Sequence, residues 1–248
     1  MDRFLDVKQA AAFTAYSPPH LFALLIFGLA VILLYLFRGW LQKGSRNRNG
    51  RYFLAAVLVI CEASLNIWYT AESVYQVKSS LPLELCSITL YLCILMLLTR
   101  SRMLFQIAYF TGIGGAIQAL LTPALDYGYP HFRFIEFFTA HIAIILAVLY
   151  MVWVERFRPT LKSIGLTMIV LNALLVVVLF VNAATGGNYM FLSRKPDSAS
   201  LLDFLGPYPW YLLSLEGVAL VLFLILYLPF VAIPSHGRKR RVQSSSEK

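Results

Sequence analysis

The chain has 248 residues, of which 59% are hydrophobic and only 13% are charged, whereas about a quarter of the residues of a soluble domain are charged. So much apolar surface cannot be hidden from water in a chain of this length, which excludes a soluble globular protein and indicates a protein folded in lipid. Basic loops beside a membrane explain the net charge of +9, and we expect no nucleic-acid partner.

Seven stretches are apolar and long enough to cross a membrane, since a helical span needs about 20 predominantly apolar residues. In chain order they are 20–38, 52–75, 82–99, 103–124, 132–154, 161–183 and 210–232. The long stretch before the last of them contains "TGGN" and "SRKPDS", which are typical of loops. The sequence therefore predicts an all-α polytopic membrane protein with seven transmembrane helices.

Two shorter segments flank this predicted transmembrane domain of residues 20–232. Residues 1–19 contain Asp2, Arg3, Asp6 and Lys8 but no early apolar run, so we expect an extracellular segment and no cleavable signal peptide. Residues 233–248 contain the sequence "GRKRR", which is typical of a cytoplasmic tail near anionic lipid.

The distribution of Lys and Arg predicts the direction of the spans. Of the 21 basic residues, 15 fall in the first, third and fifth loops and in the tail, and the others are Arg3, Lys8, Lys78, Arg133, Arg194 and Lys195. Basic loops stay on the cytoplasmic side, so we expect the N-terminus outside and the C-terminus inside. The resulting prediction is a multi-pass protein of the cell membrane.

Polar side chains within the predicted spans gather toward the outer ends. Because such side chains are costly in lipid, they usually face the interior of the bundle and often mark function. We therefore predict a polar cavity in the outer half of the bundle, open to the outside or to the outer leaflet. The candidate cavity residues are Glu62, Asn66, Glu72, Glu84, Gln118, Glu136, Asn182 and Glu216.

Several of these residues also have a structural interpretation. Glu72 and Glu136 can simply reach outer water, and Glu136 is one turn from Arg133. The three amides, Asn66, Gln118 and Asn182, are suited to hydrogen bonds between helices, worth about 0.6 kcal/mol each. By contrast, Glu62 and Glu216 lie deeper, where a carboxylate must be protonated or find partners.

A thiol and an imidazole, Cys86 and His141, form the candidate catalytic pair. If they meet, the imidazole takes the thiol proton, and the thiolate attacks an acyl carbonyl to give a thioester. A carboxylate on the far ring nitrogen would hold the tautomer, and the candidates are Glu62, Glu72 and Glu216. Counted from the outer ends of the spans, the pair differs in depth by about 5–8 Å, which helix tilt can close. The structural alternative is that Cys86 is a small apolar residue of a span.

Other catalytic signatures do not occur in the sequence, which contains no G-x-S-x-G, no H-E-x-x-H and no Walker loop. The three cysteines, Cys61, Cys86 and Cys93, lie in apolar segments and form no C-x-x-C motif. We therefore expect neither a metal nor a diffusible cofactor.

Three segments resemble a known family: "LPLELCSITLYLC" (81–93), "FFTAHIAIILAVLYM" (137–151) and "NYMFLSRKPDSASLLDFLGPYPWYLL" (188–213). Together with the rest of the chain they resemble the YwaF-type bacterial integral membrane proteins. That family is more remotely similar to an animal multi-pass acyltransferase that forms polyunsaturated ether phospholipids and is thought to carry the acyl group on a cysteine, assisted by a histidine. The resemblance implies that Cys86, in the "LPL-x-x-C" motif, and His141, in the fifth span, correspond to this pair.

Two functions are compatible with these expectations. The first is a lipid acyltransferase or transacylase, with Cys86 as nucleophile, His141 as base and membrane lipids as acyl donor and acceptor. The 188–213 segment would then cap the cavity, and Arg194 and Lys195 would bind a phosphate headgroup, although an ordinary solvated loop is the alternative. The second function is a non-enzymatic transporter or small-molecule receptor, with Glu62 and Glu216 as proton or cation sites.

Overall fold

The computed structural model describes residues 2–6, 11–195 and 201–232, and in this part of the chain the fold is helical apart from one isolated bridge between Ala12 and Tyr127. The predicted basic tail and part of the 188–213 segment lie outside the described residues. The elements are α1 (Asp2–Leu5), α2 (Pro18–Leu41), α3 (Ser45–Ala71), α4 (Leu85–Thr99), α5 (Arg102–Leu121), α6 (Phe132–Trp153), α7 (Leu161–Thr185), η1 (Tyr189–Phe191), η2 (Leu201–Leu205) and α8 (Trp210–Ala232).

Six of the described helices, α2, α3, α5, α6, α7 and α8, are long and apolar enough to cross a membrane. The outward surfaces of α2, α7 and α8 carry large apolar side chains such as Leu36, Phe180 and Leu213, which are 65%, 75% and 65% exposed. Surfaces of this kind are stable in lipid, so the chain is a multi-pass helical membrane protein. The remaining apolar helix, α4, has 15 residues and rises about 22 Å, less than the hydrocarbon thickness of about 30 Å.

Two of the predicted spans differ from the observed helices at their starts. The α3 helix begins at Ser45 and not at 52, because the polar sequence "SRNRNGR" continues the helix beyond the apolar run. The α4 helix begins at Leu85 and not at 82, because Glu84 is its N-cap and is extended, with φ −69° and ψ 146°, so the helical residues start only after it. In the other five spans, the predicted ends agree with the helices to within three residues.

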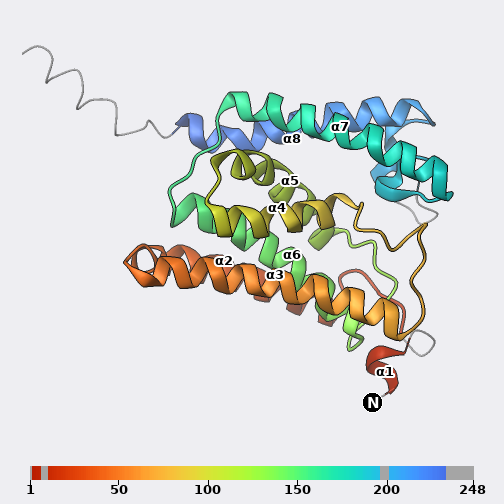
Figure 1. Cartoon of the computed structure of the whole chain (residues 1–248), viewed down its shortest axis with the longest axis horizontal. Helices are drawn as coiled ribbons and strands as arrows, with labels where there is room; N and C mark the ends of the chain where they lie inside the picture. The colour runs from red at the N-terminus through yellow and green to blue at the C-terminus, as the bar shows by residue number, and fades with distance from the viewer. Residues whose placement is uncertain (1, 7–10, 196–200, 233–248) are drawn as a thin grey trace, which may run out of the picture.

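The helices form three groups (Figure 1). The α2 and α3 helices lie along one side, α7 and α8 lie along the other, and α4, α5 and α6 lie between them. In this middle group α6 contacts α2, α3, α4 and α5, and it is buried nearly all around. The middle group therefore provides the interior in which a polar site can be shielded from lipid.

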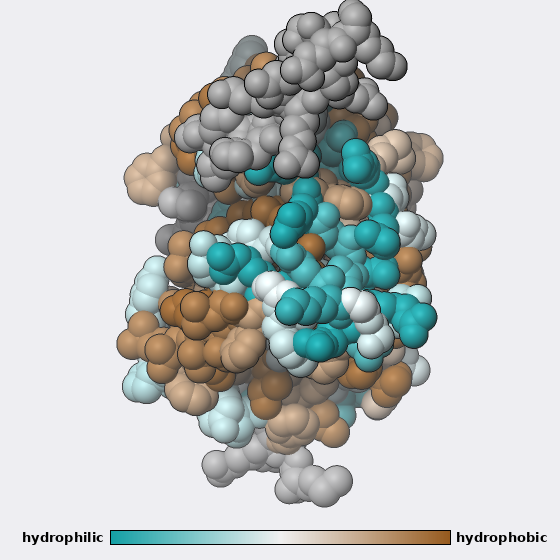
Figure 2. All heavy atoms as spheres, turned by 90° about the vertical axis from the view of Figure 1, so that its left-hand side faces the viewer, coloured by the Kyte–Doolittle hydropathy of each residue, from teal (hydrophilic) through white to brown (hydrophobic). Residues whose placement is uncertain are grey.

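One end of the bundle lies on the left in Figure 1. The helix ends and loops at this end are rich in arginine, and we call it the arginine end. There α2, α4, α6 and α8 finish and α3, α5 and α7 begin. Figure 2 looks onto this end and shows a patch of hydrophilic side chains bordered by hydrophobic ones. The described arginines of the arginine end are Arg38, Arg46, Arg48, Arg51, Arg100, Arg102, Arg156 and Arg158.

A buried ion triad joins three elements at the arginine end. The Glu155 side chain is 1% exposed; one carboxylate oxygen lies 3.2 Å from Arg51 Nε, and the other accepts bonds of 3.0 and 2.5 Å from Arg100. Arg51 also donates to the Leu97 carbonyl oxygen at 2.5 Å. The triad therefore connects α3 to the ends of α4 and α6.

We expect Glu155→Gln to lower the free energy of unfolding by about 3 kcal/mol, because it leaves the buried Arg51 without its counter-charge. The matched change Arg100→Gln should cost less than about 1 kcal/mol, because the Arg100 side chain is 55% exposed. Denaturant titration of the purified variants in one detergent measures both values. Equal losses for the two variants would contradict a structural role for the buried half of the triad.

Candidate functional site

Cys86 is the second residue of α4, and the structure leaves it as a half-buried free thiol. Its helical neighbours three, four and seven positions on are Thr89, Leu90 and Cys93, all of them buried. Side chains at these spacings share one face of a helix. Cys86 therefore belongs to the face of α4 that packs into the bundle.

His141 lies in α6, and its ring is fixed by its own helix. The Nδ1 atom is 2.7 Å from the Phe137 carbonyl oxygen, and the ring packs on Phe137 with centroids 4.2 Å apart. A carbonyl oxygen only accepts, so Nδ1 carries the proton and neutral His141 keeps an unprotonated Nε2. A backbone carbonyl thus sets the tautomer, in place of the carboxylate predicted from the sequence.

A second buried histidine, His20 in α2, is differently engaged. Its Nδ1 accepts from the Tyr16 backbone N–H at 2.8 Å, and its Nε2 lies 2.8 Å from the Leu120 carbonyl oxygen. Both ring nitrogens of His20 are therefore engaged, Nδ1 with the segment before α2 and Nε2 with α5. For His141 the structure gives no bond to Nε2 from any described residue, which makes it the better candidate for a base.

Three helices converge one turn from this pair, at Gly112 of α5. A Cβ atom added to Gly112 would lie 3.3 Å from a methyl of Ile144, 3.1 Å from one of Val148 and 3.4 Å from that of Thr89. The α4 and α6 helices therefore meet where Thr89 and Ile144 approach each other. Cys86 precedes Thr89 by three residues, and His141 precedes Ile144 by three. Because α4 and α6 run in the same direction, Cys86 and His141 both lie about one turn from the Gly112 contact, on the same side of it.

The ion triad also indicates that Cys86 and His141 lie at one level. Arg100 and Glu155 bond to each other just beyond the ends of α4 and α6. Counted from those ends, Cys86 lies about 20 Å and His141 about 18 Å along its helix. The difference of about 2 Å is smaller than the one counted from the outer ends, because α4 has 15 residues and α6 has 22, so their outer ends lie at different levels.

Thr89 adds an unpaired polar group beside the pair. It is 1% exposed, and its hydroxyl oxygen has no hydrogen-bond partner among the described residues. A buried hydroxyl without a hydrogen-bond partner lowers the stability of the fold. Its position next to Cys86 is therefore what we expect of a group that forms a hydrogen bond when a ligand binds.

The predicted cavity residues Glu62 and Asn66 form a separate cluster between α3 and α4. Glu62 accepts bonds from the Tyr91 hydroxyl at 2.6 Å and from Asn66 at 3.1 Å. Both Asn66 and Tyr91 are exposed on the surface of the bundle. This carboxylate is therefore held by two hydrogen bonds at the outer surface of the bundle.

Three other predicted residues lie elsewhere near the distal end, the end opposite the arginine end. Glu136 is buried and pairs with Arg133 in the first turns of α6. Glu72 is the C-cap of α3, and Gln118 is exposed on α5. In the α7–α8 pair, Glu216 accepts a bond of 3.1 Å from Asn172. The predicted residues are thus distributed over several places, and the described residues do not gather them into one hydrogen-bonded cluster.

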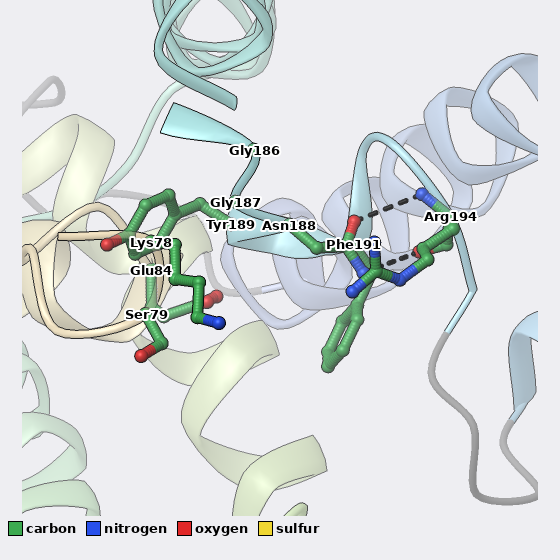
Figure 3. Close-up of a pocket in the computed structure, with 9 residues that line it drawn as sticks. All are labelled: Lys78, Ser79, Glu84, Gly186, Gly187, Asn188, Tyr189, Phe191 and Arg194. Carbon is green, nitrogen blue, oxygen red and sulfur yellow. Dashed lines mark hydrogen bonds between the residues drawn. The ribbon is translucent and has the colours of Figure 1, made fainter. Parts of the chain in front are cut away.

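Two of the remaining predicted residues, Glu84 and Arg194, line a pocket of about 280 Å³ at the distal end, which we call the distal pocket. Figure 3 shows Lys78 and Glu84 on one side of it and Asn188 and Arg194 on the other. Arg194, a predicted headgroup-binding residue, therefore lines this pocket together with Lys78. Lys195 is not among the lining residues, and its ammonium lies 5.7 Å from the centre of the Tyr211 ring.

Two hydrogen-bonded residues hold the wall of the distal pocket. Asn182 donates to the Tyr189 carbonyl oxygen at 3.1 Å and accepts from its N–H at 2.8 Å. The Tyr189 hydroxyl donates to Val77 and accepts from Leu81, and burial raises the pKa of this hydroxyl, which keeps its proton. The Glu84 carboxylate accepts from the Met190 N–H at 3.1 Å, joining the start of α4 to η1.

Sequence reasoning missed Thr89, Gly112 and Lys78 as parts of these sites. A helical wheel places Thr89 beside Cys86, so that residue had a sequence signal. The contacts of Gly112 with α4 and α6, and the position of Lys78 and Arg194 in one pocket, depend on segments distant in the chain.

Residues 15–227 match the TMEM164 family. The chain belongs to this family. A protein of Treponema pallidum (strain Nichols), described as an uncharacterized protein, is 28% identical over 246 residues, which cover 96% of this chain and 93% of that protein. No solved structure shows significant similarity to the chain.

The TMEM164 match spans α2 to most of α8 and includes Cys86, His141 and the distal pocket. Membership of the TMEM164 family supports an integral membrane protein. The resemblance to the YwaF-type proteins and to the animal acyltransferase stays a prediction.

The convergence at Gly112 predicts that thiols at positions 86 and 141 can be bridged. In a background of Cys61→Ala and Cys93→Ala, His141→Cys should react with dibromobimane to give the strong fluorescence of a doubly alkylated product. The matched control Ala140→Cys sits at the same depth on a different face of α6, and it should give a weak signal. Equal fluorescence from the two variants would contradict the proximity of positions 86 and 141.

Proposed function

We propose that this protein is a membrane lipid acyltransferase or transacylase in which Cys86 is the nucleophile and His141 the base. The observation that carries the proposal is the displacement of both residues by one turn from the same three-helix contact at Gly112. The His141 tautomer is also suited to the role, because its Nδ1 proton is committed to Phe137 and Nε2 can accept a proton.

In the first step His141 Nε2 takes the Cys86 thiol proton, and the thiolate attacks the ester carbonyl carbon of a phospholipid. The new S–C bond forms as the ester C–O bond breaks, and the departing alkoxide takes the proton from the imidazolium. The products are an acyl thioester on Cys86 and a lysophospholipid. The unpaired Thr89 hydroxyl is placed to donate to the carbonyl oxygen as negative charge develops on it.

In the second step a lysophospholipid hydroxyl gives its proton to His141 Nε2 and attacks the thioester carbonyl. The S–C bond breaks, an ester C–O bond forms, and the Cys86 thiolate recovers the proton from the imidazolium. The number of acyl groups is conserved, so the cycle consumes no cofactor when both donor and acceptor are lipids.

The distal pocket is the proposed place for a lipid headgroup, with Arg194 as the phosphate-binding residue and Lys195 as a neighbouring cation. Two observations support it: Arg194 and Lys78 line the same pocket, and Glu84, two residues before Cys86, lines it as well. Guanidinium groups recognise phosphate through paired N–H donors. In this proposal the distal end faces outward and the protein resides in the cell membrane, as the distribution of basic residues predicts.

The proposal predicts an acyl adduct on Cys86. Purified protein incubated with phospholipid carrying a labelled acyl chain should acquire a label that neutral hydroxylamine removes, as it does from thioesters. Cys86→Ala should abolish the label, whereas Cys93→Ala, a buried thiol two turns along the same helix, should retain it. Label that persists in Cys86→Ala, or none with any phospholipid tested, would favour a transporter or receptor.

His141→Asn provides a sharper test of the base. The Asn amide can still donate to the Phe137 carbonyl but cannot accept the thiol proton, so we expect the rate of labelling to fall by about 100-fold or more. Thermal unfolding of the same variant in detergent controls for loss of folding. An unchanged rate in a folded His141→Asn protein would contradict the role of His141.

A further inference from the structure

A second pocket, of about 450 Å³, lies at the arginine end and takes no part in the proposed acyl transfer. Its lining includes Arg38 near the end of α2, Trp153 at the end of α6, Arg156 and Arg158 in the α6–α7 loop, and Phe230 in α8. Its volume is within the range of about 300–1,000 Å³ that is usual for small-molecule sites. We call it the arginine pocket.

The arginine pocket is strongly cationic. Three guanidinium groups line it, and no carboxylate is among its lining residues in the described chain. Glu155, the neighbouring acid in sequence, is already bonded to Arg51 and Arg100 of the ion triad. Arg38 and Arg156 have no carboxylate partner among the described residues, and two such charges in one pocket favour an anionic ligand.

Two of these arginines are positioned by bonds that leave further donors for a ligand. Arg38 donates to the Tyr35 carbonyl oxygen at 2.5 Å, and Arg156 donates to the Gln42 side chain at 3.0 Å. Gln42 in turn donates to the Trp153 carbonyl oxygen at 2.8 Å, which joins the end of α2 to the end of α6. Each guanidinium has five N–H donors, so one such bond leaves others available to an anion.

The same pocket has a large apolar component. Trp153, Phe157 and Phe230 line it together with the three arginines, and Trp153 packs edge-on against Tyr35, with ring centroids 5.2 Å apart. Aromatic side chains of this kind are enriched where a membrane helix meets the headgroup region. A ligand that satisfies both components has an anionic head and an apolar chain.

We propose that the arginine pocket binds the phosphodiester headgroup of an anionic phospholipid, in the leaflet opposite the one that the distal pocket faces. The lipid phosphate pairs with Arg38 and Arg156, and the beginning of an acyl chain packs on the aromatic side chains. Basic pockets between transmembrane helices are suited to anionic lipids, and each nearby Lys or Arg contributes about 1 kcal/mol. This site is independent of Cys86 and His141.

The test compares two double variants that remove the same charge from the same end. Arg38→Gln/Arg156→Gln changes the pocket, and Arg46→Gln/Arg48→Gln changes α3 outside it. Binding of phosphatidylglycerol to the full chain in phosphatidylcholine nanodiscs is measured by native mass spectrometry. The pocket variant should bind phosphatidylglycerol about 30-fold more weakly, as expected for two contacts of this strength, and the control should change by less than threefold.

Two further arms complete the test. Arg38→Lys/Arg156→Lys keeps both positive charges, so it should retain more phosphatidylglycerol binding than the Gln variant. It also shows whether loss of folding explains the weaker binding of the Gln variant. Glycerol 3-phosphate in excess should fail to displace the lipid, because it lacks the apolar chain. Equal loss in both Gln variants, or full displacement by glycerol 3-phosphate, would overturn the assignment, the latter by identifying a site for a soluble phosphate.

Discussion

The close approach of α4, α5 and α6 at Gly112 is the contact on which the rest of the interior depends. Lipid provides no hydrophobic drive for one helix to leave it for another, so the association of membrane helices relies on close packing and on small residues that permit it. A Cβ at position 112 would contact α4 through Thr89 and α6 through Ile144 and Val148 at 3.1–3.4 Å. The absent side chain is therefore what allows the helices of Cys86 and His141 to meet one turn away.

The Glu155 triad controls a different degree of freedom. Packing at Gly112 brings α4 and α6 side by side, whereas the hydrogen bonds from Arg100 to Glu155, together with the ion pair between Arg51 and Glu155, set how far one helix is shifted along the other. Buried charges are costly in a membrane unless they are paired. One carboxylate between two guanidiniums satisfies that condition and leaves the triad with a net positive charge, in keeping with the basic character of this end.

The two ends of the bundle therefore present different chemistry to the two faces of a bilayer. The distal pocket combines Lys78 and Arg194 with Glu84 and leads toward the start of α4. The arginine pocket has three guanidiniums, aromatic walls and no carboxylate among its described lining residues. The two proposed lipid sites lie at opposite ends of the helices, so substitutions at one site can be studied without changing the other.

The sequence by itself determined the class of fold and the positions of the helices, because lipid requires every backbone group of a spanning segment to be bonded within it. The last span, Trp210–Ala232, was predicted without error. The bond from His141 to Phe137 links residues four apart in one helix, but the prediction from the sequence was a carboxylate in its place. Tertiary structure decided the rest: the start of α4 at Leu85, the meeting of Thr89 and Ile144 at Gly112, and the separate placement of Glu62, Glu136 and Glu216. These features depend on which face each helix turns to its neighbours, and the hydrophobic pattern of a lipid-exposed helix does not specify that face, because lipid and protein interior are equally apolar.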